Sequence, residues 1–282
     1  MGEGNKLKLK TVNRTISLFV LIVGAVISLV PFVWLIRSSL MTSTEIFEFP
    51  PKLFPEEFQW SNYLEIFSII DFLLYFKNTL LILIPVLIGT IVTCCMCGYG
   101  FARLKFPGRD FWFALIIATM MLPGAVTLIP TFLMWSELEA INTFWPLIIP
   151  AFFGGGGFFI FLMRQFFMNI PRELDESALI DGANHFQIFT KILLPLVKPP
   201  MLVVGFFTFM GVWNDFFGPL IFLNDEAKYT LALGLLQLKG SYAADWHLMM
   251  AAAAVMTVPA IVIFFIGQRY FIEGISLTGI KG

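Results

Sequence analysis

Few residues in this sequence have the type and spacing to do chemistry. Cys94, Cys95 and Cys97 stand together inside an apolar run, and thiolates in such a C-C-x-C cluster can ligate a metal. No histidine or carboxylate lies near them in the sequence, so we expect reduced thiols that face lipid or neighbouring helices, and no metal site. The two histidines, His185 and His247, flank different elements, which gives no support to a Ser-His-Asp or Cys-His arrangement. We therefore expect that the chain is not an enzyme.

The sequence also lacks the usual device for binding ATP. Residues 154–157 are four consecutive glycines, but neither Lys-Ser nor Lys-Thr follows them. The phosphate-binding pattern G-x-x-x-x-G-K-[ST] occurs nowhere in the chain. We therefore expect no cofactor in this chain, and an ATP-driven role would need ATP and Mg on separate ATPase subunits.

The composition is that of an integral membrane protein. The 282 residues are 58% hydrophobic and include 33 Phe, while only 13% are charged, against about 25% in an ordinary soluble domain. The mean hydropathy is +0.85. The net charge of −1 gives no reason to expect nucleic acid as a partner.

Six apolar runs are long enough to cross a membrane as helices. They predict an all-α membrane protein with a single transmembrane domain over residues 1–282, and spans near residues 15–36, 78–100, 111–135, 144–163, 201–223 and 248–267. Pro123 and Pro130 lie within the third run and permit a static kink or a moving hinge there. The glycines at 154–157 predict local unwinding or very close helix packing in the fourth run.

The fifth run is interrupted by Asn214 and Asp215, which follow Trp213. An acid at membrane depth is costly against lipid, so it should face protein or a water-filled path. These three residues are therefore candidates for a substrate path, and the alternative for Asp215 is a structural hydrogen bond to a neighbouring helix.

The basic residues predict the orientation. Most of the 18 Lys and Arg residues fall before the first span, between the second and third spans, between the fourth and fifth, and after the sixth. Because cytoplasmic loops carry the excess of Lys and Arg, both termini and the segment 171–200 are expected on the cytoplasmic side. The chain is expected to cross a membrane several times in contact with lipid.

The segment 171–200 is the longest polar interruption in the second half of the chain. A proline followed by acids is typical of a helix start, since the acids face the positive end of the helix dipole; here these residues are Pro171, Glu173, Asp175 and Glu176. Asp181-Gly182 indicates a break, because Gly accepts the left-handed backbone that closes a helix. A second short helix is expected from about Asn184, with one apolar face formed by Phe186, Phe189 and Leu193. By local pattern alone, an amphipathic segment lying on lipid headgroups is the alternative.

The spacing within this segment resembles the EAA loop of bacterial ABC-importer permeases. The matching residues are Glu176, Ser177, Ala178, Gly182, Ile192, Leu194 and Pro195. Ser177 stands where the family usually has a second small Ala, and Ser is also small. Other stretches extend the likeness over nearly the whole chain: NTLLI (78–82), GYGFARLKFPGR (98–109), MMLPGAVTLIPTF (120–132), WNDFFGPLIFL (213–223) and the C-terminal RYFIEGISLTGIKG. The chain is similar to carbohydrate-importer permeases related to the smaller permease subunit of the maltose transporter.

This resemblance implies a type I ABC importer permease fold with six transmembrane helices and cytoplasmic coupling helices between the fourth and fifth spans. It further implies a permease subunit of an ATP-driven, binding-protein-dependent sugar importer. The implied partners are a second permease in a heterodimer, two ATPase subunits, an extracytoplasmic sugar-binding protein and a saccharide substrate.

The resemblance also assigns roles to residues. The EAA-like loop would dock on one ATPase, and the coupling residues are then Glu176, Ser177, Ala178, Asp181, Gly182, Phe186, Phe189, Ile192, Leu194 and Pro195. The loop before the last span would reach the binding protein with Gly240, Ser241 and Tyr242 at its tip.

Other classes of protein remain as alternatives. A channel or secondary transporter would suit the glycine cluster and Asp215 as an ion-coupled site, but the hydropathy shows no two-fold repeat. A membrane-embedded enzyme would need a catalytic set that the sequence does not contain. The identity of the sugar is not predicted by this chain.

Overall fold

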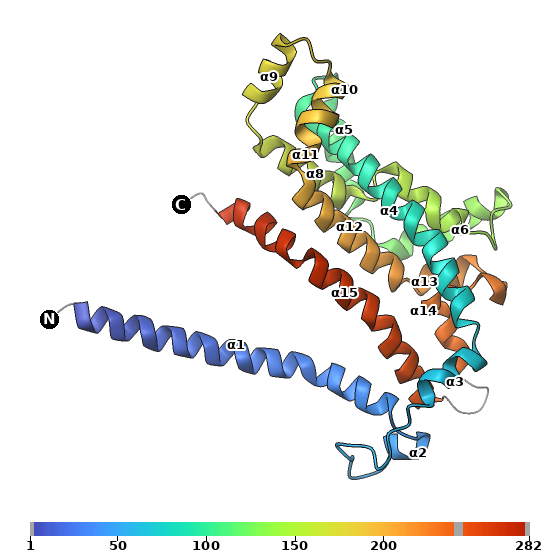
Figure 1. The fold of residues 1–282 in the computed structure, drawn as a ribbon. Coiled ribbons are helices and arrows are strands. Elements are labelled where there is room, and N and C mark those ends of the chain that lie inside the picture. Colours follow the sequence, from blue (N-terminus) through green and yellow to red (C-terminus); the bar gives the residue numbers. More distant parts are fainter. Residues whose placement is uncertain (1–2, 240–244, 280–282) are drawn as a thin grey trace. The chain divides into compact units, whose positions relative to one another are not determined.

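The computed structural model describes residues 3–239 and 245–279, and the side chains of residues 14–239 and 245–268. All extended regular elements of the described residues are helical (Figure 1). They are α1 (Glu3–Ser39), α2 (Ser43–Ile46), α3 (Asn62–Ile69), α4 (Phe72–Arg103), α5 (Arg109–Thr119), α6 (Gly124–Glu137), α7 (Trp145–Ile148), η1 (Ile149–Phe153), α8 (Gly157–Asn169), α9 (Glu173–Ile180), α10 (His185–Gln187), η2 (Ile188–Leu193), α11 (Leu194–Leu196), α12 (Lys198–Trp213), α13 (Phe217–Phe222), η3 (Glu226–Lys228), α14 (Leu231–Gly234), η4 (Leu235–Leu238) and α15 (Trp246–Gly279).

Long apolar helices are the main elements of the described chain. Four stretches are long and apolar enough to cross a membrane: Arg14–Ser39, Phe72–Arg103, Trp145–Asn169 and Trp246–Gln268. The number rises to six when each of two bent helix pairs is taken as one span. These pairs are Arg109–Thr119 with Gly124–Glu137, bent by 99°, and His185–Leu196 with Lys198–Trp213, bent by 78°.

The chain divides into two compact units. Unit 1 contains Met1–Ile70 and Gln237–Thr257, and unit 2 contains Asp71–Leu236 and Val258–Gly282. In unit 1, the segment after α1 is fixed by Asn62, whose side-chain nitrogen donates to the carbonyls of Ser39 (2.9 Å) and Met41 (3.0 Å). Thr42 and Glu45 form a capping box that starts α2.

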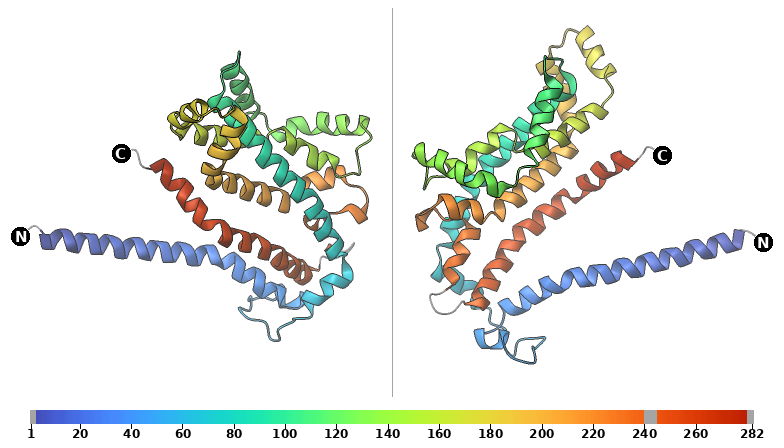
Figure 2. Two further views of the ribbon diagram at one scale, coloured as in Figure 1. Left: turned by 45° about the horizontal axis from the view of Figure 1, so that its top comes forward. Right: turned by 180° about the vertical axis from the view of Figure 1, so that it is seen from behind.

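Unit 2 is built around α4. Helices α8 and α12 both pack along α4, and the two views of Figure 2 show the three helices lying side by side. The α4–α8 contact is close because Gly98 has no side chain. A Cβ at Gly98 would lie 2.7 Å from Cβ of Met163 and 3.0 Å from the backbone nitrogen of Arg164.

The predicted fourth span, 144–163, unwinds at its glycines and also packs closely there. Gly154, Gly155 and Gly156 have φ angles of +93°, +64° and +112°, and they separate η1 from α8. A Cβ at Gly155 would overlap the side chain of Thr90 in α4. Both expected uses of the glycines, unwinding and close approach, are therefore confirmed.

The predicted third span, 111–135, is a bent helix pair, and the kink that its prolines were expected to permit lies at Pro123. Helix α5 ends at Thr119, and α6 begins at Gly124 after a sharp turn. Pro123 occupies the N-cap of α6 with φ −61° and ψ 136°. A proline disfavours helical backbone at the residue before it, so the chain turns at Pro123, whereas Pro130 lies within α6.

The predicted fifth span, 201–223, is also wrong in extent. Helix α12 ends at Trp213, and the short α13 follows after a break. The side-chain nitrogen of Asn214 donates to the carbonyl of Met210 (2.9 Å), and Asp215 Oδ1 accepts from the backbone N–H of Gly218 (3.0 Å). Side chains that bond the local backbone compete with helix continuation, which explains the break.

We predict that Gly98→Ala destabilises the protein by about 1 to 3 kcal/mol, because the added methyl group meets backbone that cannot move aside without separating α4 from α8. The matched control is Gly100→Ala in the same helix, where a Cβ has no atom within 4 Å. Thermal unfolding in detergent, followed by fluorescence-detected size exclusion, measures the difference. Equal unfolding temperatures for the two variants would contradict this account of the α4–α8 contact.

Candidate functional site

The polar segment after α8 forms two short helices joined by a tight bend, as predicted. Helix α9 ends with two hydrogen bonds, from Gly182 N–H to the carbonyl of Leu179 (3.1 Å) and from Ala183 N–H to the carbonyl of Ala178 (2.9 Å). Gly182 has φ +84°, so the bend is a Schellman motif closed by glycine. The expected second start is also confirmed, because Asn184 caps α10 in a capping box with Gln187. We call residues 171–197 the two-helix module.

The apolar face predicted for Phe186, Phe189 and Leu193 does not form. Phe186 is 70% exposed, whereas Phe189 and Leu193 are 8% and 0% exposed. The prediction assumed 3.6 residues per turn, but residues Ile188–Leu193 form a π-helix, η2. The wider turn changes which side chains share a face.

The inner side of the module packs against the end of α4. Phe189 lies between Tyr99 and Phe167, with ring centroids 5.0 and 6.3 Å apart, and Ala178 is buried in the same cluster. The hydroxyl of Tyr99 donates to the carbonyl of His185 (3.2 Å). The side chains of Ala178 and Phe189 therefore support the module from within and are not part of its exposed surface.

Arg103 attaches the other half of the module to α4. Its guanidinium donates to the carbonyl of Ile170 (2.6 Å), and its Nε lies 3.5 Å from Oδ2 of Asp175 in α9. The side chains of Arg103 and Asp175 are 4% and 18% exposed. Because both charges are largely removed from water, loss of one partner strongly destabilises the protein. Tyr99 and Arg103 were not predicted as site residues, although both lie in the GYGFAR stretch that the sequence resemblance had included.

The outer side of the module is apolar and exposed. Ile180 is 86% exposed, Leu179 is 46% exposed, and Phe186 lies nearby in sequence across the bend. We call Leu179, Ile180 and Phe186 the outer face. Leu179 and Ile180 were not among the predicted coupling residues; their position just before the glycine bend is the signal that could have indicated them.

The remaining predicted coupling residues differ in exposure. Ile192 and Leu194 are half-buried, and the exposed residues are Glu176, Ser177, Asp181, Gly182 and Pro195. The hydroxyl of Ser177 donates to the carbonyl of Leu174 (3.1 Å) in its own helix. Within the part of the chain whose side chains are described, no basic group lies within ion-pair distance of Glu176.

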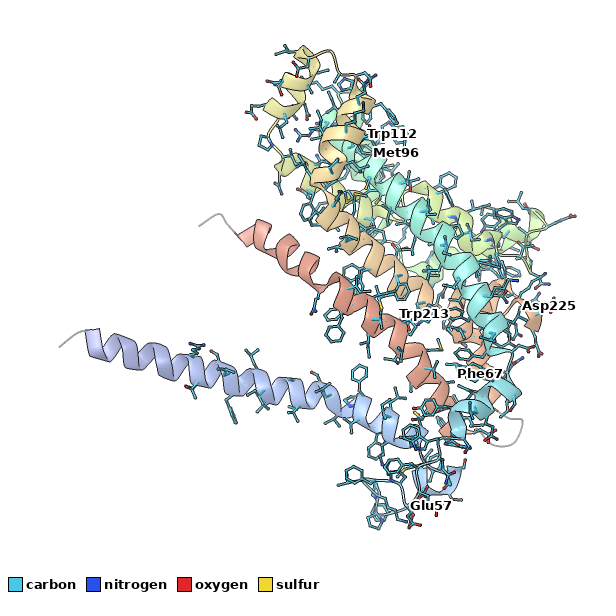
Figure 3. All side chains as sticks on the ribbon, viewed as in Figure 1. Glu57, Phe67, Met96, Trp112, Trp213 and Asp225 are labelled. Carbon is cyan, nitrogen blue, oxygen red and sulfur yellow. The ribbon has the colours of Figure 1, made fainter. Side chains whose placement is uncertain are left out.

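The three candidates for a substrate path do not share one surface. Trp213 is 2% exposed and stacks on Phe209 with ring centroids 5.4 Å apart, with the ring of Phe76 at its edge. It therefore belongs to the packing of α12 on α4, and its place on a substrate path stays a prediction. Figure 3 labels Trp213 at the end of α12. Asn214 is exposed and caps α12.

Asp215 has a local structural role and also reaches a small cavity. It caps the start of α13 through Gly218, so its main hydrogen bond is local and does not go to a neighbouring helix. A cavity of about 30 Å³ lies beside it, lined also by Thr79, Leu147 and Thr230. The buried hydroxyl of Thr230 has no hydrogen-bond partner in the structure. This space is the size of one water molecule, not of a substrate path.

The outer-loop residues are only partly described. Gly240, Ser241 and Tyr242 lie outside the described residues. The part of the loop that precedes them is attached to α4, because Asn78 donates to the carbonyls of Ala227 (2.9 Å) and Tyr229 (3.0 Å).

A second asparagine, Asn142, attaches the beginning of this loop. Its Oδ1 accepts from the backbone N–H groups of Asn224 and Asp225, both at 3.1 Å. Its carbonyl also accepts from Lys228 (2.8 Å). Sequence reasoning did not identify Asn142, which lies at a left-handed position with φ +60°.

The cysteines show the packing that the sequence suggested. Cys94 and Cys95 are buried among side chains of α4 and its neighbours, and all three cysteines are free thiols. Among the residues whose side chains are described, no three His, Cys, Asp or Glu side chains come together as a set of metal ligands.

The family described as binding-protein-dependent transport system inner membrane component matches residues 86–276. This match covers more than half of the chain, and the chain belongs to that family. It is a multi-pass membrane protein with the fold of type I ABC importer permeases.

Individual relatives extend the comparison. A probable ABC transporter permease, YurM of Bacillus subtilis, is 31% identical over 258 residues, which are 89% of this chain and 83% of YurM. The arabinooligosaccharides transport system permease protein AraQ of Halalkalibacterium halodurans is 31% identical over 92% of this chain and 93% of AraQ. A chain in the crystal structure of a bacterial ABC transporter for the import of alginate matches with a TM-score of 0.81. The match covers 93% of this chain and 97% of that chain at 21% identity, and it supports the assignment of the fold.

We predict that Asp175→Asn loosens the attachment of α9 by about 1 to 3 kcal/mol, because the substitution keeps the shape but leaves the buried Arg103 charge without a carboxylate. Hydrogen exchange of the α9 amides in the purified protein reports this opening. The matched control is Glu173→Gln, which removes an exposed acid from the same first turn. If both variants exchange at the same rate as the native protein, the Arg103–Asp175 pair does not hold α9.

Proposed function

We propose that this chain is a permease subunit of an ATP-driven, binding-protein-dependent importer of saccharides. It forms half of the translocation path with a second permease, and two ATPase subunits and an extracytoplasmic sugar-binding protein complete the assembly. The support for a saccharide is that the AraQ relative is named for arabinooligosaccharides and the structural neighbour for alginate. In this proposal both termini and the two-helix module lie on the cytoplasmic side of the bacterial cytoplasmic membrane, where Lys and Arg accumulate.

The observation that carries the proposal is the two-sided character of the module. Its inner side is fixed to α4 by Tyr99 and Arg103, and its outer face leaves Ile180 and Phe186 exposed. Exposed apolar side chains on a rigid support are suited to a protein partner. Burial of a side chain such as Phe186 contributes about 1.5 to 3 kcal/mol, whereas a surface pair made by Glu176 contributes less than about 1 kcal/mol. The outer face therefore provides most of the docking energy for an ATPase subunit.

The same attachment makes mechanical coupling possible. Helix α4 has 32 residues, which corresponds to about 48 Å, longer than the hydrocarbon core of a bilayer. Its far end is bonded through Asn78 to the loop at Ala227 and Tyr229. A displacement of the module by the ATPase is thus passed to a continuous helix that contacts the opposite loop, and this is the link that alternating access needs.

The glycine bend gives a test of docking. A Cβ at Gly182 meets no atom of the described residues within 4 Å, so a side chain there extends into the space where the partner would bind. We predict that Gly182→Val abolishes copurification of the ATPase and substrate-stimulated ATP hydrolysis, while Glu176→Ala reduces hydrolysis only a few-fold. The measurement uses the complex purified through a tag on this chain, from membranes with equal amounts of each variant.

Gly182→Asn separates docking from backbone strain. Valine at φ +84° costs roughly 1 to 2 kcal/mol in strain, whereas asparagine tolerates the left-handed region. Loss of the ATPase in both variants is the result expected if the side chain obstructs docking. Normal attachment and normal coupled hydrolysis in both variants would refute the proposed docking role. Uptake of labelled mono-, di- and oligosaccharides by the native complex then identifies the saccharide.

A further inference from the structure

A second feature lies beside the two-helix module and has no part in the proposed docking. A surface hollow of about 510 Å³ lies between the α4–α5 connection and the start of α9. Three basic residues line it, Lys105, Arg109 and Arg172, together with one acid, Asp110. Its volume falls within the range of small-molecule sites.

The basic side chains in the hollow are not neutralised by the protein. Arg109 pairs with Asp110 (2.9 Å). No carboxylate lies within ion-pair distance of Lys105 or Arg172 in the part of the chain whose side chains are described. The lining therefore keeps an excess of two positive charges, which favours an anion with more than one oxygen acceptor.

The two segments that form the hollow are held in place by other contacts. In the α4–α5 connection, Phe106 packs on Phe101 with ring centroids 5.8 Å apart, and Phe101 in turn packs on Phe113 (5.6 Å). Gly108 adopts φ +73° and allows the turn into α5. The chain before α9 is held through the bond from Arg103 to the carbonyl of Ile170. The hollow is thus preorganised, since the backbones that carry its bases are fixed before a ligand binds.

The position of the hollow indicates the source of the anion. It lies where the membrane-length helix α4 ends and where α5, the first half of a bent helix pair, begins. The aromatic residues beside it, Phe111 and Trp112, are 65% and 53% exposed, and Figure 3 labels Trp112 near the end of α4. Exposed aromatic side chains with bases at the end of a span are typical of the headgroup level of a bilayer.

We propose that this hollow binds the phosphate of an anionic phospholipid headgroup. Lys105 and Arg172 contact the phosphate oxygens from the two sides of the hollow, and the acyl chains lie along the exposed aromatic residues Phe111 and Trp112. Basic pockets between transmembrane helices at the cytoplasmic side bind such headgroups. Because Arg172 is the N-cap of α9, the lipid would connect the first helix of the module to the membrane surface.

The test is native mass spectrometry of the complex purified through a tag on this chain. The complex is delipidated and titrated with phosphatidylglycerol, with phosphatidylcholine, or with phosphatidylglycerol in the presence of millimolar inorganic phosphate. We expect tight adducts with phosphatidylglycerol, none of comparable affinity with phosphatidylcholine, and little competition by phosphate. The variant Lys105→Gln/Arg172→Gln should bind phosphatidylglycerol roughly thirtyfold more weakly, because each base near an anionic headgroup contributes about 1 kcal/mol.

Two control variants make the result specific to the hollow. Lys191→Gln/Lys198→Gln removes two exposed bases from neighbouring segments that do not line the hollow, and its affinity should stay native. Lys105→Arg/Arg172→Lys keeps the charges and should restore most of the binding. The proposal is overturned if both glutamine pairs weaken lipid binding equally, or if the first pair has no effect. Displacement of the lipid by phosphate alone would assign the hollow to a free anion and overturn the lipid assignment.

Discussion

A helix that breaks at membrane depth leaves backbone N–H and C=O groups that must find partners inside the protein. In unit 2, polar side chains of α4 provide many of these partners. The hydroxyl of Thr93 accepts from the N–H of Gly154 (3.0 Å) at the break between η1 and α8, and its proton is shared between the carbonyls of Gly89 (2.6 Å) in its own helix and Ala151 (3.2 Å). Thr79 accepts from the N–H of Leu231 at the start of α14. Other members of the set are Asn78, Tyr99 and Arg103, each bonded to carbonyls of a connecting segment. The broken helices thus depend on one unbroken helix.

The need for partners inside the protein also applies to the buried side chain of Arg103. The Arg103 guanidinium is costly to bury, and it is stabilised because it meets both the Ile170 carbonyl and the Asp175 carboxylate. The same side chain holds the segment that precedes Arg172, so the attachment of the two-helix module and one wall of the basic hollow share a single support. Tyr99, one turn earlier in α4, holds the second half of the module at His185.

Periodicity, proline and glycine predicted much of this structure from the sequence. The apolar runs indicated the helices, and Asp181-Gly182 and Asn184 gave the bend and second start of the module correctly, since these signals act through local backbone chemistry. The fifth span was predicted too long because Asn214 and Asp215 were read as residues within a helix, whereas their side chains bond the local backbone. The buried positions of Phe189 and Trp213 depend on rings of distant helices and on the π-helical turn, which no local pattern indicates. The structural role of Arg103 could not be predicted from local sequence, because its partners lie 67 and 72 residues away.

The central claim is that the outer face of the module meets an ATPase, on the opposite side of the membrane from the loop that Asn78 attaches. Site-directed photo-cross-linking tests it most directly, with p-benzoylphenylalanine in place of Phe186 or, as the matched position at the other end of α4, in place of Glu226, both exposed. After irradiation of intact cells, the account predicts a cross-link from position 186 to the ATPase subunit and none to it from position 226. A cross-link to the ATPase from position 226 would contradict the account. The absence of a cross-link from both positions, while the ATPase still copurifies, would contradict it as well.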